Sequence, residues 1–110
     1  MLPKIYRLTK KKDFQIVFQK GKSIKSGFLV FKILKNHFIK SRFGFIVSKK
    51  ISTKATVRNK IKRRIRDSIF THVKKINIPI DVVVITLPGI EKKEFSDIEG
   101  AVAEFFKKIT

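Results

Sequence analysis

The segment VRNKIKRRIRD, residues 57–67, limits the possible folds more than any other part of the chain. It places six basic side chains among eleven positions and leaves branched aliphatic residues four positions apart. Residues four apart lie on one face of an α-helix, so the spacing predicts a helix with a single apolar stripe. The stripe consists of Val57, Ile61, Ile65, Ile69 and Val73. We therefore predict a helix over residues 56–75 that buries one face and presents cations on the other.

The charge of the whole chain also indicates an anionic partner. Lysine and arginine number 27 against 8 acidic residues, which gives a net charge of +19 and a pI near 10.6. Residues 1–90 carry the whole excess, +20, whereas residues 91–110 have a net charge of −1. Self-repulsion of this size destabilises the compact state, and a polyanion is the usual partner that relieves it. A general lysine bias is the plainer alternative, but such a bias would not spare the C-terminal segment.

The remaining pattern predicts one α+β domain spanning residues 1–110. Helices are predicted at residues 12–20, 56–75 and 93–109, and strands at residues 27–34, 43–48 and 81–87. The order α-β-β-α-β-α contains a strand–helix–strand crossover, which favours a mixed sheet in a two-layer α/β sandwich with three helices. We expect Gly21 to end the first helix in a left-handed conformation, Gly44 to allow close packing within a strand, and Phe95 to lie on the core side of the last helix.

The sequence contains no arrangement typical of an enzyme active site. Five of the eight acidic residues lie in the last twenty positions, and the two histidines, His37 and His72, have no motif around them. The chain has no cysteine and no glycine-rich phosphate loop. We therefore predict no catalytic residue and no metal ligand in the protein. Because no apolar run approaches the ~18 residues of a membrane span, we expect a cytoplasmic protein without a membrane partner.

Binding of nucleic acid is the function that remains. The basic loop and helix over residues 49–66 combine a helix N-terminus, which favours phosphate, with arginine side chains that match phosphate oxygens. Phenylalanines at 14, 18 and 31 suggest a second contact, because exposed aromatic rings flanked by lysine can stack on unpaired bases. The same spacing also suits a hydrophobic core, and the residues alone favour the core interpretation.

The run FGFIVSKKISTKATVRNKIKRRIRDSIF, residues 43–70, closely resembles the protein subunit of bacterial ribonuclease P. That family is marked by a Ser-Lys-Lys strand end followed by an Arg-Asn-Arg-x-x-Lys-Arg helix. The upstream DFQIVFQKG and the downstream DVVVITLPG match in order and spacing, so the resemblance covers nearly the whole chain. One departure is Lys60, which stands where the family usually has the second arginine of the motif and so lacks its planar fork.

The resemblance implies a definite function. The family's protein assists a large catalytic RNA, expected here in a 1:1 complex, and the resulting endoribonuclease removes the 5′ leader from precursor tRNA. Hydrolysis occurs on Mg²⁺ ions held by the RNA subunit, so the protein itself is expected to bind no cofactor and to need no protein partner. The implied fold is similar to the second domain of a ribosomal small-subunit protein, with an unusual left-handed βαβ crossover.

The resemblance also implies two sets of binding residues. The family's basic helix docks on the catalytic RNA. The resemblance implies this role for Lys49, Lys50, Lys54, Arg58, Asn59, Lys60, Lys62, Arg63 and Arg66. Its central cleft between the first helix and the sheet holds the single-stranded leader, a role that we carry to Phe14, Phe18, Leu29 and Phe31.

Two other functions use the same physical chemistry. A ribosomal or general RNA-binding protein with no processing role would also need a basic helix, and the helix alone does not exclude it. A stand-alone nuclease is disfavoured because the acidic residues are scattered along the chain. The RNA that copurifies with the protein would separate the first alternative from the processing subunit.

Overall fold

The structure is a computed structural model that describes residues 2–38, 40–76 and 78–109. Its helices and strands follow one another as α1 (Lys11–Lys20), β1 (Lys22–Ser26), β2 (Leu29–Lys35), β3 (Arg42–Ile46), α2 (Ala55–His72), β4 (Ile80–Thr86) and α3 (Phe95–Ile109). The described residues also form three short 3-10 helices: η1 (Lys4–Tyr6) before α1, η2 (Val73–Lys75) directly after α2, and η3 (Ile90–Lys92) between β4 and α3. No helix in the described part of the chain combines the length and apolar character needed to cross a bilayer.

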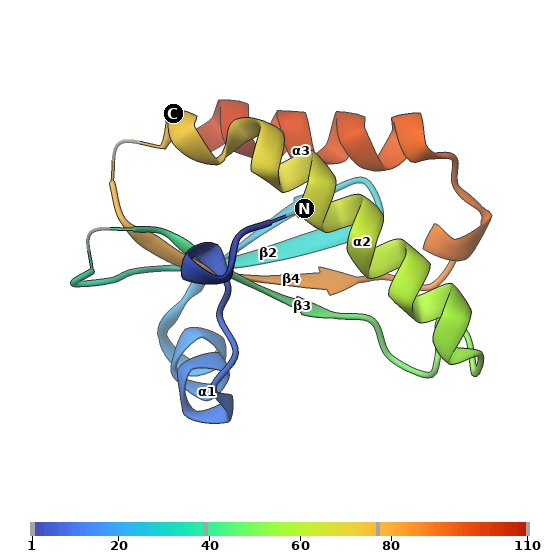
Figure 1. Cartoon of the computed structure of the whole chain (residues 1–110), viewed down its shortest axis with the longest axis horizontal. Helices are drawn as coiled ribbons and strands as arrows, with labels where there is room; N and C mark the ends of the chain where they lie inside the picture. Colours follow the sequence, from blue (N-terminus) through green and yellow to red (C-terminus); the bar gives the residue numbers. More distant parts are fainter. Residues whose placement is uncertain (1, 39, 77, 110) are drawn as a thin grey trace.

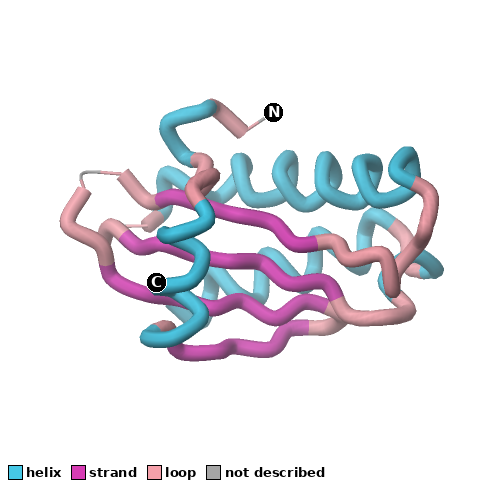
Figure 2. The backbone as a smooth tube through the Cα atoms, turned by 90° about the horizontal axis from the view of Figure 1, so that it is seen from below, coloured by secondary structure: helices cyan, strands magenta, loops and turns pink. Residues whose placement is uncertain are grey.

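The four strands form one mixed sheet in the order β1-β2-β4-β3. β3 and β4 run parallel, while β2 is antiparallel to both β1 and β4. α2 and α3 cover one face of this sheet and give the expected two-layer sandwich, and α1 crosses the opposite face (Figures 1 and 2). The α+β class with a mixed sheet and three helices is therefore confirmed.

The β3–α2–β4 connection has the left-handed sense that the family resemblance implies. In Figure 1 the chain leaves β3, which lies nearest the viewer, rises through α2 above the sheet and returns to β4 behind it. Almost all crossovers between parallel strands are right-handed, so general rules of chain connection would have given the opposite sense.

The first strand, β1, is absent from the sequence prediction. Its residues Lys22–Ser26 contain only one apolar side chain, Ile24, so they lack the alternating pattern of a half-buried strand. The strand forms because a tight turn at Gly27, with φ of +56°, folds it back on β2. Its Ser26 hydroxyl lies 2.9 Å from the carbonyl oxygen of Ala101 in α3, which fixes the edge of the sheet to that helix.

Two local expectations are wrong. Gly21 follows α1 with φ of −76° and ψ of 155°, an extended conformation, because the chain enters β1 directly. Glycine is still needed there, since a Cβ atom would crowd the carbonyl oxygens of Val17 and Ile33. Phe95, expected on the core side of the last helix, is 39% exposed, and the guanidinium of Arg64 lies 5.9 Å from its ring centroid.

The sheet separates two hydrophobic clusters. The larger lies between the sheet and α2 and α3, where the rings of Phe31 and Phe105 stack with centroids 3.9 Å apart. The smaller lies under α1 and is built around Leu8, Val17 and Val83. Because successive residues of a strand point to opposite faces, each strand contributes alternate side chains to the two clusters. This alternation decides which side chains of β2 are available for binding.

Candidate nucleic-acid interface

The loop between β3 and α2 is held in place by one buried side chain and two serine turns. Ile51 is buried, and its N–H donates to the Ser48 carbonyl at 3.0 Å. The Ser52 hydroxyl accepts a hydrogen bond from the N–H of Lys54 at 3.2 Å. The three lysines of the loop are exposed: Lys49, Lys50 and Lys54. The loop therefore presents its cations on a fixed backbone.

α2 begins directly after this loop without a side-chain cap. Lys54 is the N-cap residue, its side chain makes no capping hydrogen bond, and no acidic residue occurs in the first turn. Uncapped N–H groups and the positive end of the helix dipole both favour a bound anion. The lysines of the loop add full charges at the same end of the helix, so this end is strongly electropositive.

The polar residues of α2 divide into exposed and half-buried groups. Asn59, Lys60 and Arg63 are exposed to solvent, whereas Arg58, Lys62 and Arg66 are half-buried. Ile61, Ile65 and Ile69 fix the helix on the sheet, since each has at most 6% of its surface exposed. The predicted RNA-binding residues thus all lie in one loop and one helix. They differ in how far each side chain is exposed to a ligand.

Two of the half-buried arginines have partners within the protein. A guanidinium nitrogen of Arg58 donates to the Ser52 carbonyl at 2.9 Å and ties the loop to the helix. The guanidinium of Arg66 lies 5.5 Å from the ring centroid of Phe45, and its buried Nε has no hydrogen-bond partner among the described residues. Burial lowers the pKa of Arg66, and the nearby charge of Arg7 lowers it further. Among the predicted residues of α2, Asn59, Lys60 and Arg63 are therefore the most accessible to a ligand.

The predicted leader-binding residues do not share one surface. Leu29 and Phe31 are 1% and 0% exposed and belong to the cluster under α2 and α3, on the far side of the sheet from α1. Their assignment to a surface beside α1 is wrong, because odd-numbered residues of β2 face the other helices. Phe14 and Phe18 do lie on α1, where Phe14 is half-buried and Phe18 is 37% exposed.

The side chains of β2 that do face α1 are the neighbours of Leu29 and Phe31 along the strand. Val30 pairs with Ile85, which pairs with Ile46, so the three form a half-buried apolar row across three strands. In the next row the ammonium of Lys32 lies 5.7 Å from the ring centroid of Phe18. We call the combined surface the α1 face; it consists of Phe14, Phe18, Val30, Lys32, Ile46 and Ile85. The sequence shows the alternation, but it does not show which face the long helices cover.

Gly44 permits the contact between α1 and β3. A Cβ atom at this position would overlap the ring of Phe14, so close packing at Gly44 is confirmed. We expect Gly44→Ala to lower the free energy of unfolding by about 1–3 kcal/mol, because the ring must move out of a packed site. Urea denaturation followed by circular dichroism measures the change.

Gly100 supplies a matched control for that substitution. It lies in α3, is exposed, and would place a Cβ in open space. Gly100→Ala should therefore raise the free energy of unfolding by about 0.5–1 kcal/mol, since alanine costs less conformational entropy in a helix. Equal effects of the two substitutions would contradict the role of Gly44 in positioning Phe14.

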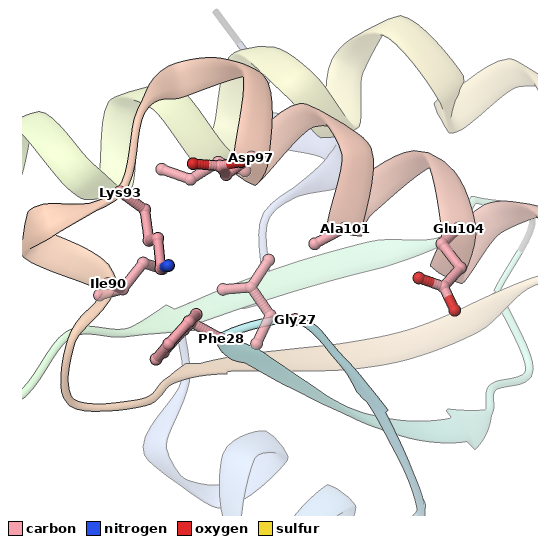
Figure 3. Close-up of a pocket in the computed structure, with 9 residues that line it drawn as sticks. Gly27, Phe28, Ile90, Lys93, Asp97, Ala101 and Glu104 are labelled. Atoms are coloured by element: carbon pink, nitrogen blue, oxygen red, sulfur yellow. The ribbon is translucent and has the colours of Figure 1, made fainter.

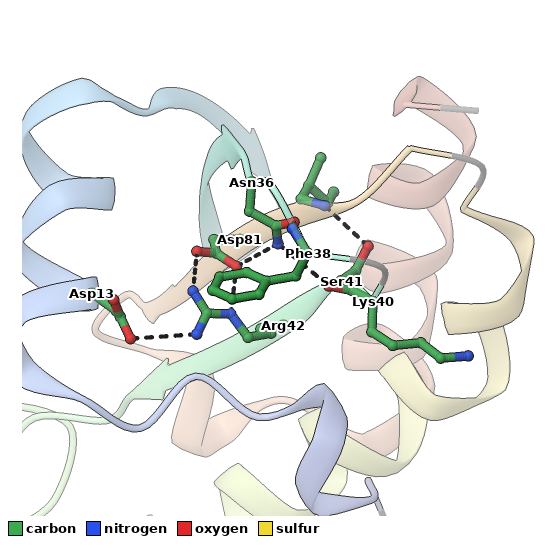
Figure 4. A network of polar contacts seen from close by, with 8 residues as sticks. Asp13, Asn36, Phe38, Lys40, Ser41, Arg42 and Asp81 are labelled. Atoms are coloured by element: carbon green, nitrogen blue, oxygen red, sulfur yellow. Dashed lines mark hydrogen bonds and ion pairs between the residues drawn. The ribbon is translucent and has the colours of Figure 1, made fainter.

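A network of charged and polar groups joins α1 to the sheet at the start of β3 (Figure 4). Arg42 donates from Nε and a terminal nitrogen to the two oxygens of Asp81, at 2.9 and 2.6 Å. Its other terminal nitrogen lies 3.4 Å from Asp13 on α1. The hydrogen bond to Asp81 raises the pKa of Arg42. Both acids are therefore paired with Arg42 and stabilise the fold. They do not neutralise the other cations of this region.

A depression lies at the β1 edge of the sheet, between the β1–β2 turn and α3 (Figure 3). Its volume is about 300 Å³, and the polar side chains that line it are Lys93, Asp97 and Glu104. The Ser26 hydroxyl lies 3.1 Å from Glu104, and the Lys93 ammonium lies 4.8 Å from the Phe28 ring centroid. Lys108 and Ser26 both lower the pKa of Glu104 through hydrogen bonds. Its two carboxylates make this depression a poor match for a polyanion.

The described residues contain no group of three His, Asp or Glu side chains that could hold a metal ion. His72 packs on Phe106 with ring centroids 5.2 Å apart, and burial lowers its pKa. His72 is therefore occupied in packing α2 against α3.

Comparisons with known sequences identify the family of the chain. A family model described as Ribonuclease P matches residues 2–110. The chain is 33% identical over 103 residues to the Ribonuclease P protein component of Alkaliphilus metalliredigens, covering 94% of this chain and 92% of that one. It is 46% identical over 88 residues to the same component of a Synechocystis species, covering 79% and 71%.

Solved structures give the same result for the fold. The RNase P protein of Staphylococcus aureus superposes with a TM-score of 0.83 at 33% identity, over 94% of each chain. The RNase P protein of Thermotoga maritima in complex with 1-(4-fluorophenyl)-2-thiourea gives a TM-score of 0.85 at 30% identity, over 94% of this chain and 100% of that one. Sequence, fold and basic helix therefore agree that the chain belongs to the ribonuclease P protein component family.

Proposed function

We propose that this protein binds the catalytic RNA of ribonuclease P in a 1:1 complex and holds the 5′ leader of precursor tRNA for removal. The observation that carries the proposal is the position of two different surfaces on opposite faces of one sheet. α2 lies on one side of the sheet and α1 on the other (Figure 1), and Phe18 of the α1 face is 37% exposed. Two RNA strands could therefore bind at the same time.

The two surfaces suit different parts of an RNA. Lysine and arginine on α2 neutralise phosphates, and the gain comes mainly from counterion release and depends little on sequence. On the α1 face, Phe18 and the apolar row offer flat, nonpolar contacts to unpaired bases, while Lys32 lies close enough to neutralise a phosphate. Such a surface accepts leaders of many sequences. Hydrolysis takes place at Mg²⁺ ions that the RNA subunit holds. The complex works in the bacterial cytoplasm.

Reconstitution tests the proposal directly. The protein is mixed with a bacterial ribonuclease P RNA, and cleavage of precursor tRNA is followed at low magnesium concentration, where the RNA alone works poorly. We expect the protein to restore release of the 5′ leader. A general RNA-binding protein would bind RNA without restoring cleavage, and a stand-alone nuclease would cut precursor tRNA without added RNA; either result would overturn the proposal.

The exposed cations of α2 should control the affinity for the catalytic RNA. Replacing Lys60 and Arg63 together by alanine should weaken binding and reduce the slope of log K against log salt by about one to two units, because two phosphate contacts are lost. The measurement is a salt titration of the binding constant. Lys107→Ala with Lys108→Ala, at the end of α3, serves as a control with the same loss of charge away from the interface. An equal loss of slope in both variants would mean that only net charge matters.

Phe18 should distinguish precursor from mature tRNA. Phe18→Ala in the holoenzyme should reduce affinity for leader-bearing tRNA by about 1–3 kcal/mol and leave the affinity for mature tRNA unchanged, because a stacked base is lost. Binding is measured with both RNAs under the same salt concentration. A similar loss for both RNAs, accompanied by a lower melting temperature, would place Phe18 among the residues that stabilise the fold.

A further inference from the structure

Phe38 is an exposed aromatic residue beyond the end of β2, whereas the apolar row of the α1 face crosses that strand at Val30. It lies in the connection between β2 and β3, and 56% of its surface is accessible. One face of its ring is covered by the guanidinium of Arg42, whose Cζ lies 4.3 Å from the ring centroid (Figure 4). A guanidinium that covers one face of a ring leaves the opposite face for another flat partner.

The ring is held by the same network that joins α1 to the sheet. Asp81 and Asp13 fix the guanidinium of Arg42 beneath the ring. Asn36 donates to Asp81 at 2.7 Å and accepts a hydrogen bond from the Phe38 N–H at 2.9 Å. The backbone of Phe38 and one face of its ring are thus tied to a single buried carboxylate. Preorganisation of this kind reduces the entropy lost when a ligand binds.

The surroundings of Phe38 favour an anionic ligand. A depression of about 430 Å³ is lined by Ile5, His37, Phe38, Lys40 and Arg42, a set that contains no carboxylate. Lys40 is one of the residues that line the depression, and its ammonium lies 5.7 Å from the ring centroid of Tyr6. Asp13 and Asp81 each form an ion pair with Arg42, one of the lining residues.

We propose that Phe38 and Lys40 form a second contact site for an unpaired nucleotide of RNA, separate from the α1 face. The base stacks on the face of Phe38 opposite Arg42, and Lys40 neutralises the adjacent phosphate. Charge complementarity favours RNA over a protein segment, because the site combines one open aromatic face with cations and has no unpaired acid. The inference rests on the proposed function and adds to it a place where RNA beyond the leader is held.

The site is distinct from the α1 face by position. Phe18 contacts Lys32 in the middle of β2, whereas Phe38 follows the end of that strand. Asp13 and Phe18 also lie on different sides of α1, since five residues correspond to about 500° of helical rotation. The two contacts therefore lie at different positions along the sheet and should contribute independently.

A short, unstructured oligouridine with a fluorescent label tests the proposal on the full chain. Affinity is compared between Phe18→Ala and Phe18→Ala with Phe38→Ala, so that the α1 face is already weakened. We expect the second substitution to reduce affinity at least fivefold, as loss of one base–aromatic stack predicts. Phe38→Tyr should keep the affinity within about twofold. Phe95→Ala serves as the control, because Phe95 is also an exposed ring beside an arginine.

Crosslinking gives a measurement that a purely structural role would not change. A 4-thiouridine oligonucleotide should form crosslinks to the peptide that contains Phe38 and Lys40, and Lys40→Gln should reduce both the crosslink and the affinity. Lys40→Gln leaves Arg42 and its acids intact, so it remains informative if Phe38→Ala lowers the melting temperature.

The outcomes separate this inference from the proposed function. Unchanged affinity in Phe38→Ala and Lys40→Gln, with a loss in Phe18→Ala, would overturn the second site and leave the leader contact standing. Full affinity in all three variants would contradict both. Loss of binding to an acidic peptide in place of RNA would show that the site accepts protein and would also overturn the proposal.

Discussion

Phe31→Ala is expected to lower the free energy of unfolding by about 3–5 kcal/mol, a large part of the stability of a domain this size. Phe31 is 0% exposed, and its ring stacks on Phe105 in the larger hydrophobic cluster. Truncation removes the transfer free energy of the ring and leaves a cavity between the sheet and α3. Urea denaturation measures the loss.

The comparison with Phe18→Ala makes the result specific. Phe18 is 37% exposed, so its truncation should cost less than about 1 kcal/mol of stability while it weakens leader binding. Phe31→Ala should do the reverse wherever the protein remains folded. A stable Phe31→Ala protein with a selective loss of leader affinity would contradict the position of Phe31 in the core and restore it to the leader-binding surface.

Arg42→Ala should lower the free energy of unfolding by about 3 kcal/mol, because it leaves the buried carboxylate of Asp81 without its cation. The side chains of Arg42 and Asp81 are 19% and 9% exposed, so water replaces little of the lost interaction. The measurement is again chemical denaturation, at a pH where the carboxylate is charged. Arg63→Ala is the control, since Arg63 is exposed and should change stability by no more than about 0.5 kcal/mol.

Two further variants separate charge from shape in this network. Arg42→Lys keeps the charge but loses the planar fork that binds both oxygens of Asp81, so an intermediate loss is expected. Adding Asp81→Asn to Arg42→Ala should recover part of the stability, because a neutral amide does not need a cation. A loss below about 1 kcal/mol in Arg42→Ala would mean that Asp81 is solvated well enough without Arg42.

The basic helix could be predicted almost completely from the sequence. The four-residue spacing of branched side chains fixes both its helical state and the face that it buries, and the structure agrees from Ala55 through the 3-10 turn that ends at Lys75. Periodicity of this kind is local, since it depends only on residues within a few turns. The cations of the loop before the helix lie on the surface, as their local run in the sequence predicts.

Strand β2 shows where local patterns fail. Residues 29–34 are mostly apolar at both odd and even positions, so either set could face the long helices. The choice depends on which face α2 and α3 cover, and this follows from contacts between distant segments. The cleft role of Leu29 and Phe31 was implied by the family resemblance, and the pattern of the strand could not correct it; Val30 and Lys32 are the residues of this strand that face α1.

The sequence by itself determined the basic helix, the excess of cations, the class of fold and the family, because these depend on local spacing and on motifs. Only the tertiary structure decided which face of the sheet is open, that Lys22–Ser26 forms an edge strand, and that Arg42 joins Asp13 to Asp81. Arg42 lies 29 residues from one acid and 39 from the other, so no local pattern connects them. Such contacts form only when the left-handed crossover brings β3 beside β4 and α1 packs beneath them.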